Sequence, residues 1–263
     1  MFCMKFPVCL FLSLCFIAQA SEPIVPKKVI RPFETGDLSK FDTWLKETGH
    51  KDPDKVFSLK DGVLHVTGYG AGYVATKQSY KDYHLKLEYK WGKKINGGKY
   101  VRNSGVLLHG NGDHGASRGV WMSSLEVQLA QGCEGDFIVI RGKGGPKVDI
   151  TCKTRIADDK RTRWDPNGKP TRYTGRQFWW NNHQPFFKEL LDTKGKDDVA
   201  SPLGEWTKVE CVCKGDVVSI FINGVNVNEA YDVFPQSGKI LLQNETHEVY
   251  FRNFEIHPLK KTK

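Results

Sequence analysis

Short segments of alternating hydrophobicity, separated by turn dipeptides, constrain the fold of this chain more than any other feature. In residues 84–91, apolar and aromatic side chains alternate with polar ones at a period of two, as in a half-buried strand. Asn223-Gly224 separates two further alternating runs and suits a tight hairpin turn, and Asp61-Gly62 separates another pair. Strong helical periodicity is missing from the sequence. The pattern therefore predicts an all-β chain, folded as a two-sheet antiparallel β-sandwich.

The N-terminus carries the pattern of an export signal. Lys5 precedes an apolar run over residues 8–18, and Ala18-Gln19-Ala20 forms a small-x-small cleavage pattern. The run is too short for a stable membrane span, which needs roughly 20 apolar residues. We predict a cleaved signal peptide over residues 1–20, with Ser21 as the first mature residue and a secreted or periplasmic location. The alternative is a retained membrane anchor. No later apolar run is long enough to span a membrane.

The remaining chain is expected to form one domain. Residues 21–32 are rich in Pro and Lys and read as an extended lead-in, residues 33–258 as a single β-sandwich domain, and residues 259–263 as a basic tail. Residues 154–199 are polar and weakly patterned, which predicts a long loop insertion over one rim of the sandwich. Trp179-Trp180 in this insertion either stack on sugar rings or pin the insertion to the sandwich.

Charge and cysteine usage limit the partners and cofactors. The net charge is +9, but the basic residues are scattered and no nucleic-acid-binding module is recognisable, so we predict no nucleic-acid partner. The mature chain keeps Cys133, Cys152, Cys211 and Cys213. Cys133 and Cys152 either form a disulfide or stay as buried thiols. Because these spacings do not resemble a zinc site, we predict no metal and no other cofactor, and leave a divalent cation open. The sequence predicts no oligomeric state.

Residues 124–129 carry the strongest indication of chemistry. In a strand, Glu126 and Gln128 point to one face and the three aliphatic side chains to the other. The aliphatic set must face the second sheet, so Glu126 and Gln128 are expected on an outer, concave or open side. A carboxylate beside an amide offers acceptors and donors to sugar hydroxyls, and Trp121 lies just upstream. The alternative is an ordinary solvated strand face.

Four further residues are candidates. Arg102 and Asn103 precede a predicted strand over residues 104–109, in which alternation makes His109 point the same way as Leu107. An imidazole with a pKa of about 6.5 suits acid–base chemistry, and the alternative is a loop histidine without a role. Asp136 begins another strand. It could orient a site group, bind a cation or cap a turn, of which the last is favoured.

Several of these segments together resemble a known family. The matching segments are Asn103-Ser104-Gly105-Val106, Leu125-Glu126-Val127-Gln128-Leu129, Gly135-Asp136-Phe137, Gly204-Glu205-Trp206, Ile222-Asn223-Gly224, and residues 238–243 and 251–256. In their order and spacing, the chain resembles the 3-keto-disaccharide hydrolase domain family over residues 33–258. The resemblance implies a jelly-roll fold similar to concanavalin A-like lectins and glucanases.

The resemblance also implies action on 3-keto sugars. The ketone acidifies the proton on C2, a base removes it, and the glycosidic bond breaks by β-elimination, after which water can add to the enone. This chemistry needs a base, a group that polarises the ketone and a proton donor for the leaving oxygen. Many members carry an acidic residue a few positions after the Glu-x-Gln strand, where this chain has Ala130 and Gln131. That departure leaves the activity and the substrate open.

We therefore predict a secreted carbohydrate-active protein that cleaves 3-keto-glycosides, with Glu126 or His109 as the base. The residues assigned to substrate binding are Arg102, Asn103, Trp121, Gln128 and Asp136. The first alternative is a noncatalytic carbohydrate-binding module. The second is a conventional endo-glucanase, which needs another carboxylate about 5–9 Å from Glu126. The third is a surface or scaffold protein without a sugar site.

Overall fold

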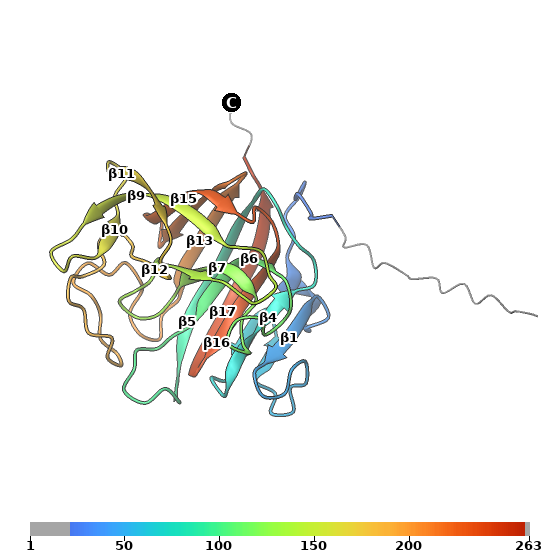
Figure 1. Cartoon of the computed structure of the whole chain (residues 1–263). Coiled ribbons are helices and arrows are strands. Elements are labelled where there is room, and N and C mark those ends of the chain that lie inside the picture. The colour runs from blue at the N-terminus through green and yellow to red at the C-terminus, as the bar shows by residue number, and fades with distance from the viewer. Residues whose placement is uncertain (1–21, 261–263) are drawn as a thin grey trace, which may run out of the picture.

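The computed structural model describes residues 22–260, which form two antiparallel β-sheets that lie face to face (Figure 1). The predicted all-β sandwich is confirmed. One 3-10 turn, η1 (Pro32–Thr35), is the sole helical element in this part of the chain. The predicted signal peptide lies outside the described residues. Within residues 22–260, no helix has the length and apolar character needed to cross a membrane.

The smaller sheet has seven strands. Their spatial order is β1 (Phe41–Leu45), β4 (Ala71–Thr76), β16 (Lys239–Glu245), β6 (Gly105–Asn111), β7 (Ser123–Gln128), β8 (Phe137–Ile140) and β12 (Gln177–Phe178). Strand β16 comes from the C-terminal third of the chain and pairs with both β4 and β6. This sheet carries the Glu126 strand.

The larger sheet has ten strands. Their order is β10 (Thr162–Trp164), β9 (Asp149–Ile156), β15 (Val225–Phe234), β14 (Val217–Ile222), β13 (Thr207–Lys214), β5 (Tyr83–Ile95), β17 (His247–Pro258), β3 (Val63–Val66) and β2 (Phe57–Lys60), with β11 (Lys169–Tyr173) paired to β9. The Asn223-Gly224 turn joins β14 to β15 with φ values of 48° and 82°. Both are positive, as the expected hairpin turn requires.

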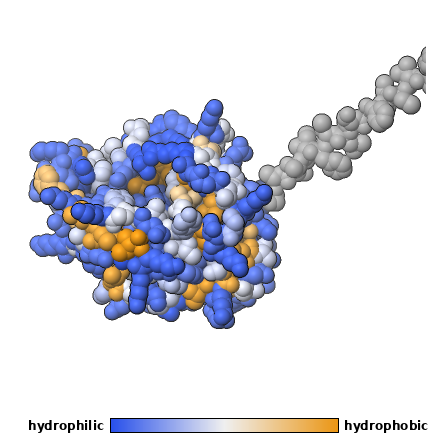
Figure 2. Space-filling model, turned by 90° about the horizontal axis from the view of Figure 1, so that it is seen from below, coloured by the Kyte–Doolittle hydropathy of each residue, from blue (hydrophilic) through white to orange (hydrophobic). Residues whose placement is uncertain are grey.

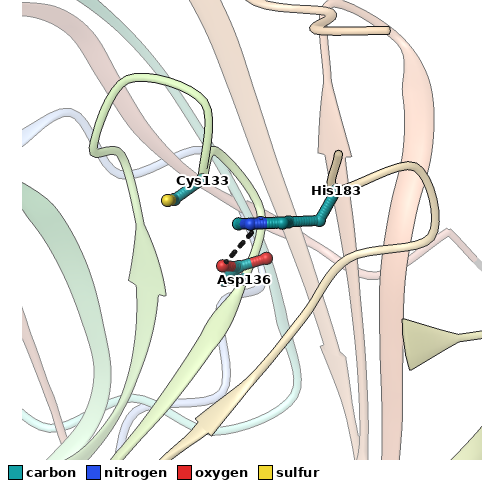
Figure 3. Close-up of side chains that lie close together, drawn as sticks. All are labelled: Cys133, Asp136 and His183. Carbon is teal, nitrogen blue, oxygen red and sulfur yellow. Dashed lines mark ion pairs between the residues drawn. The ribbon is translucent and has the colours of Figure 1, made fainter. Parts of the chain in front are cut away.

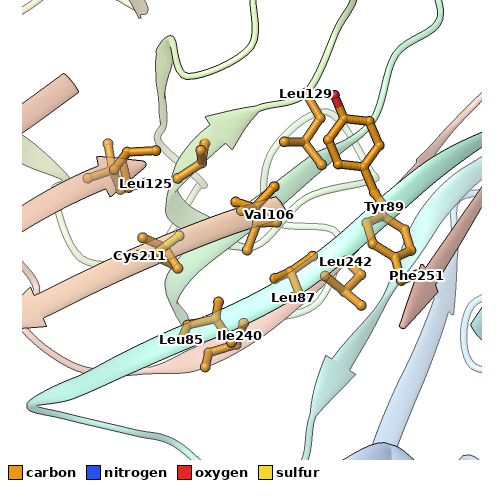
Figure 4. Close-up of a cluster of buried hydrophobic side chains, with 14 of the residues drawn as sticks. Leu85, Leu87, Tyr89, Val106, Leu125, Leu129, Cys211, Ile240, Leu242 and Phe251 are labelled. Atoms are coloured by element: carbon orange, nitrogen blue, oxygen red, sulfur yellow. The ribbon is translucent and has the colours of Figure 1, made fainter. Parts of the chain in front are cut away.

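The core fills the space between the sheets. Leu85 and Leu87 of β5 are buried and lie beside Ile240 and Leu242 of β16 in the smaller sheet (Figure 4). The polar residues between them in β5 point the other way and are half-buried. Fully burying one such aliphatic side chain contributes about 1.5–3 kcal/mol, so the period-two pattern of these strands is what holds the sheets together.

The surface of the sandwich is largely polar. Figure 2 shows one face of the molecule, on which hydrophilic residues surround several separate apolar patches. Among residues 22–260, the most exposed large apolar side chain is Phe186, at 73%. Separate patches of this kind are normal for a protein surface and do not by themselves indicate an interface.

The insertion is not entirely loop. Strand β9 runs on to Ile156, β10 and β11 both pair with β9, and β12 extends the smaller sheet by pairing with β8. The sequence pattern did not predict these short strands. In β11, for example, the residues are mostly exposed, so neither face has to be apolar. Trp180 is 2% exposed in the core between the sheets, so it pins the insertion to the sandwich.

The four cysteines of the described chain are free and buried. Of the two alternatives that the sequence left open, the structure therefore has buried thiols and not the Cys133–Cys152 disulfide. Cys152, Cys211 and Cys213 belong to the core between the sheets, where each acts as a small apolar side chain. Cys133 lies in a separate small cluster with Val101 and Ala130.

Candidate functional site

Strand β7 presents its two faces as the alternation predicts. Leu125 and Val127 are buried in the core between the sheets. Glu126 points to the opposite face, which we call the outer face of the seven-stranded sheet. Register places it between Leu107 of β6 and Ile138 of β8. The side on which the carboxyl lies is therefore confirmed.

The expectation that this side is open is wrong at Glu126, whose exposure is 3%. A second apolar cluster covers the outer face, and its buried members are Tyr73, Ala75, Leu107, Val120, Trp121, Met122, Ile138, Ile140 and Leu241. Trp121 is itself 8% exposed and packs in this cluster near Tyr73, with 6.2 Å between the ring centroids. Strand alternation tells which face a residue takes but not which later loop folds over that face.

The Glu126 carboxyl lies against the backbone of β6 at Gly105. A β-carbon at position 105 would stand 2.4 Å from Glu126 Oε1, so the absence of a side chain creates the space for the carboxyl. Oε1 has no hydrogen-bond partner among the described residues. Burial raises the pKa of Glu126 well above its usual range, and the charge of Glu245 adds to this, whereas Arg176 and the Gln243 amide oppose it. Such a carboxyl keeps its proton to a higher pH than an exposed glutamate, and perturbed carboxyls of this kind are candidates for acid–base chemistry.

A second carboxyl belongs to the same end of the outer face. Glu245, the last residue of β16, is half-buried, and burial raises its pKa against the opposing charges of Arg176 and Arg118. Both arginine side chains are exposed. Asn103 forms an isolated bridge to Glu245, and its Oδ1 atom is buried without a partner in the described chain. Two carboxyls therefore belong to this end of the face, where the charges of Arg176 and Arg118 act on Glu245 and that of Arg176 also acts on Glu126.

An aromatic cluster occupies the β1–β4 end of the outer face. The Tyr73 hydroxyl lies 2.7 Å from His114 Nδ1. The His114 ring stacks on Trp44 and meets His50 edge to face, at centroid distances of 5.5 and 4.8 Å. Burial, His50 and Lys239 lower the pKa of His114, and burial raises the pKa of Tyr73. The pair is thus a neutral hydrogen bond. Sequence reasoning missed both residues, because His114 lies in a Gly-rich loop without a motif.

His109 does not join Glu126. It has a φ of 55°, and the register between β6 and β7 shifts between Leu108 and Asn111. The ring packs edge to face on Tyr83 of the core, with 5.9 Å between centroids, and Nδ1 lies 2.8 Å from the Pro235 carbonyl. The prediction that it points the same way as Leu107 is wrong, since the bulge interrupts the alternation. Burial lowers its pKa to about 4.

Arg102 and Gln128 have contacts within the protein. Arg102 is buried, and it donates from Nε to Asp192 at 2.8 Å and from Nη1 to the Gly92 carbonyl at 3.0 Å. Arg102 therefore holds the insertion through Asp192. None of these contacts involves Glu126. Gln128 lies on the side of Glu126, and its Oε1 accepts hydrogen bonds from the next two backbone amides. Its amide nitrogen makes none within the described residues.

Asp136 is fully buried and anchors the insertion. Its carboxylate accepts hydrogen bonds from the Trp180 backbone amide at 2.7 Å and from Gln177 Nε2 at 2.9 Å. His183 Nδ1 lies 3.2 Å away, and Cys133 completes a group of three ligand-type side chains (Figure 3). The favoured turn-capping role is therefore wrong, because the carboxylate bonds to residues more than 40 positions along the chain.

Comparisons with known proteins agree with this architecture. A family model described as a 3-keto-alpha-glucoside-1,2-lyase-like domain matches residues 30–257. A glycosyl hydrolase-like protein of Parabacteroides distasonis ATCC 8503 has a similar structure, with a TM-score of 0.52, 18% sequence identity, and coverage of 89% of this chain and 94% of that chain. A second protein from the same organism has a TM-score of 0.48 and 20% sequence identity, with coverage of 88% of this chain and 100% of that chain. A carbohydrate-binding module of Bacillus subtilis has a TM-score of 0.40 and 11% sequence identity, with coverage of 76% of this chain and 84% of that chain. No curated protein matches the sequence.

Proposed function

Because the chain belongs to the family of 3-keto-alpha-glucoside-1,2-lyase-like domains, we propose that it cleaves 3-keto-glycosides by base-promoted elimination at the outer face. The observation that carries the proposal is the Glu126 carboxyl, which is buried beside Gly105 and has one oxygen without a partner in the described chain. Burial also raises its pKa. Among the predicted bases, His109 is unsuited, since its ring faces the core.

The proposed reaction needs no second carboxylate at the anomeric carbon. Glu126 takes the proton from C2 of the sugar, and the electron pair of that C–H bond forms the C1=C2 double bond. The bond from C1 to the glycosidic oxygen breaks, and the leaving oxygen takes a proton. The products are an enone and the freed alcohol, and water can add to the enone afterwards. General base catalysis of this kind contributes typically about 10²–10⁴-fold.

The other groups at this end of the face fit the remaining tasks. Arg176 and Arg118 are exposed cations near the carboxyls, and they can stabilise the negative charge that develops on the ketone oxygen. Glu245 is the second carboxyl at this end of the face and, when protonated, can supply the proton to the leaving oxygen. Because the apolar cluster covers the rest of the face, the sugar would enter from the side of these arginines.

The test is turnover of a panel of 3-keto disaccharides, followed by enone absorbance and release of the second sugar. We expect Glu126→Gln to lower kcat by about 10²–10⁴-fold. Glu134→Gln is the matched control, since Glu134 is also a buried glutamate with a raised pKa but lies beside Asp198 of the insertion. It should keep the wild-type rate. Equal rates for wild type and Glu126→Gln would remove Glu126 from the mechanism.

A noncatalytic carbohydrate-binding protein is the second candidate, and the observation that favours it is the 3% exposure of Glu126. The same panel separates the two. Retention of a glycan without any product from the 3-keto substrates would support binding alone and contradict the proposed elimination.

A further inference from the structure

Three ligand-type side chains from separate segments meet where the insertion joins the smaller sheet. Cys133 lies in the loop between β7 and β8, Asp136 directly precedes β8, and His183 follows β12 in the insertion. Figure 3 shows the His183 ring and the Asp136 carboxylate facing each other, with the Cys133 side chain beside them. The Cys133 sulfur, a carboxylate oxygen of Asp136 and a ring nitrogen of His183 all lie within 4.8 Å of one another. The exposures of these residues are 1%, 0% and 4%.

The spacing is close to that of a metal centre. With Zn–S at about 2.3 Å and Zn–N or Zn–O at about 2.0–2.2 Å, the ligand atoms of a tetrahedral zinc stand about 3.3–3.8 Å apart. His183 Nδ1 and Asp136 Oδ2 are already 3.2 Å apart. Side-chain movements of about 1 Å would bring all three atoms to bonding distance of one ion.

Neighbouring hydrogen bonds hold two of the ligands in place. The Asp136 carboxylate is oriented by the Trp180 amide and the Gln177 side chain, and the His183 carbonyl accepts a hydrogen bond from Arg163 Nε at 3.0 Å. Such outer contacts are what fix the ligands of protein metal sites. His183 Nδ1 itself makes no hydrogen bond within the described residues, although the residue is 96% buried. A buried nitrogen without a hydrogen bond therefore faces the cluster.

The charges around Cys133 favour a cation and argue against a nucleophile. The Cys133 thiol is 1% exposed, and the charges that act on it are the carboxylates of Asp136, Glu189, Glu134 and Asp198. A nucleophilic cysteine needs an electropositive and accessible setting, and Cys133 has neither. A divalent cation would reverse this field and favour the thiolate. The triplet is therefore not the nucleophile, base and orienting acid of a hydrolase.

We propose that Cys133, Asp136 and His183 bind one zinc ion, which ties the insertion to the sandwich. A thiolate and an imidazole favour zinc over calcium or magnesium, which prefer oxygen ligands. One thiolate and one carboxylate balance the two charges of the ion, so the buried centre is neutral. A water molecule completes the fourth position. The sequence spacing of the cysteines could not indicate this site, since it takes a single cysteine and a histidine 50 positions along the chain.

The test uses the full mature chain after removal of metal with a chelator. Titration with Co²⁺, a spectroscopic substitute for zinc, should give a thiolate-to-cobalt charge-transfer band that saturates at one ion per chain. Added Zn²⁺ should displace the cobalt. At a free Zn²⁺ concentration 100 times its Kd, the equilibrium constant for unfolding should fall about 100-fold. A wild-type chain that gives no charge-transfer band, or whose unfolding does not respond to Zn²⁺, would overturn the proposal without any variant.

Matched cysteine variants locate the site. Cys133→Ser should lose the charge-transfer band and the zinc-dependent stabilisation. Cys152→Ser, which removes an equally buried thiol from the core between the sheets, should keep both. A band that survives in Cys133→Ser and disappears in Cys152→Ser would contradict the assignment. The outcome is independent of the proposed elimination, because no ligand of this centre belongs to the Glu126 end of the outer face.

Discussion

Replacing Gly105 by alanine tests the link between the Glu126 carboxyl and activity while leaving the glutamate in the chain. The added β-carbon would stand 2.4 Å from Oε1 and 3.0 Å from Cγ of Glu126, inside ordinary van der Waals contact, which begins at 3.4 Å. Gly105 does not have a positive φ, so alanine fits the backbone. The substitution therefore acts on the position of the carboxyl.

The two expected effects differ in size. Restoring contact distance needs a carboxyl displacement of about 1 Å, and a misplacement of that size can lower a rate about 100-fold, or about 2.7 kcal/mol in the barrier. Turning a side chain about 30° off its rotamer costs about 0.5–1.5 kcal/mol of stability. Reduced freedom of the unfolded chain offsets about 0.4–1 kcal/mol of that cost. Gly105→Ala should thus lose about 100-fold in kcat and at most about 1 kcal/mol in unfolding free energy.

Gly92→Ala is a matched control. Its β-carbon would also stand 2.4 Å from a glutamate carboxyl, that of Glu248. Glu248 accepts hydrogen bonds from the Lys93 and Lys94 amides and pairs with His65, and these contacts lower its pKa to about 2. Disturbing them should cost about 1.5–3 kcal/mol of stability. Turnover should stay near the wild-type value, because Glu248 belongs to β17 of the larger sheet.

The measurements are initial rates on a 3-keto disaccharide and urea unfolding of the three proteins. Turnover of Gly105→Ala within about threefold of wild type would contradict the link between the Glu126 carboxyl and activity. Equal losses of activity in Gly92→Ala and Gly105→Ala would contradict it too, since the effect would then come from general destabilisation. A double variant with Glu126→Gln should be no slower than Glu126→Gln alone, because both changes remove the same group.

Four further outcomes are expected. Since the native pKa of Glu126 lies above its usual 4.5, the native state keeps that proton longer than the unfolded state, and the unfolding free energy of wild type should fall relative to Glu126→Gln above about pH 4.5. In urea titrations across pH, this relative loss of unfolding free energy should reach up to about 1.4 kcal/mol per pH unit until the native carboxyl ionises. Asp159→Ala removes the 2.7 Å partner of fully buried Arg163 and should cost about 3–5 kcal/mol in the same assay. Trp180→Ala should cost about 3–5 kcal/mol and raise protease sensitivity of the insertion. Protein recovered from an exporting host should begin at Ser21 by mass spectrometry.

Local patterns in the sequence predicted the parts of the fold that depend on neighbouring residues. Alternation over residues 84–91 predicted which side chains of β5 enter the core, and Leu85 and Leu87 are buried there. Asn223-Gly224 predicted a hairpin whose two positive φ values the structure has. Both succeed because side-chain direction in a strand and the geometry of a two-residue turn are set within a few residues.

The candidate site could be predicted only in part. The face taken by Glu126 followed from the aliphatic residues on either side of it. The direction of the His109 side chain could not be predicted, because one bulge reverses the direction of every later side chain in a strand. The 3% exposure of Glu126 also did not follow, because Trp121 and its neighbours fold over the sheet from a loop whose path has no local pattern.

By itself, the sequence determined that this chain forms two sheets with an aliphatic interior, and that one acidic residue of β7 is kept out of that interior. The period of two in a strand leaves no other arrangement when one face must avoid water. Only the tertiary structure decided what surrounds that acid and what holds the insertion. Glu126 lies against Gly105 and under the charge of Glu245, and Cys133 lies beside His183, through chain segments far apart in sequence. Such contacts depend on the packing of whole sheets and loops, which no short stretch of residues encodes.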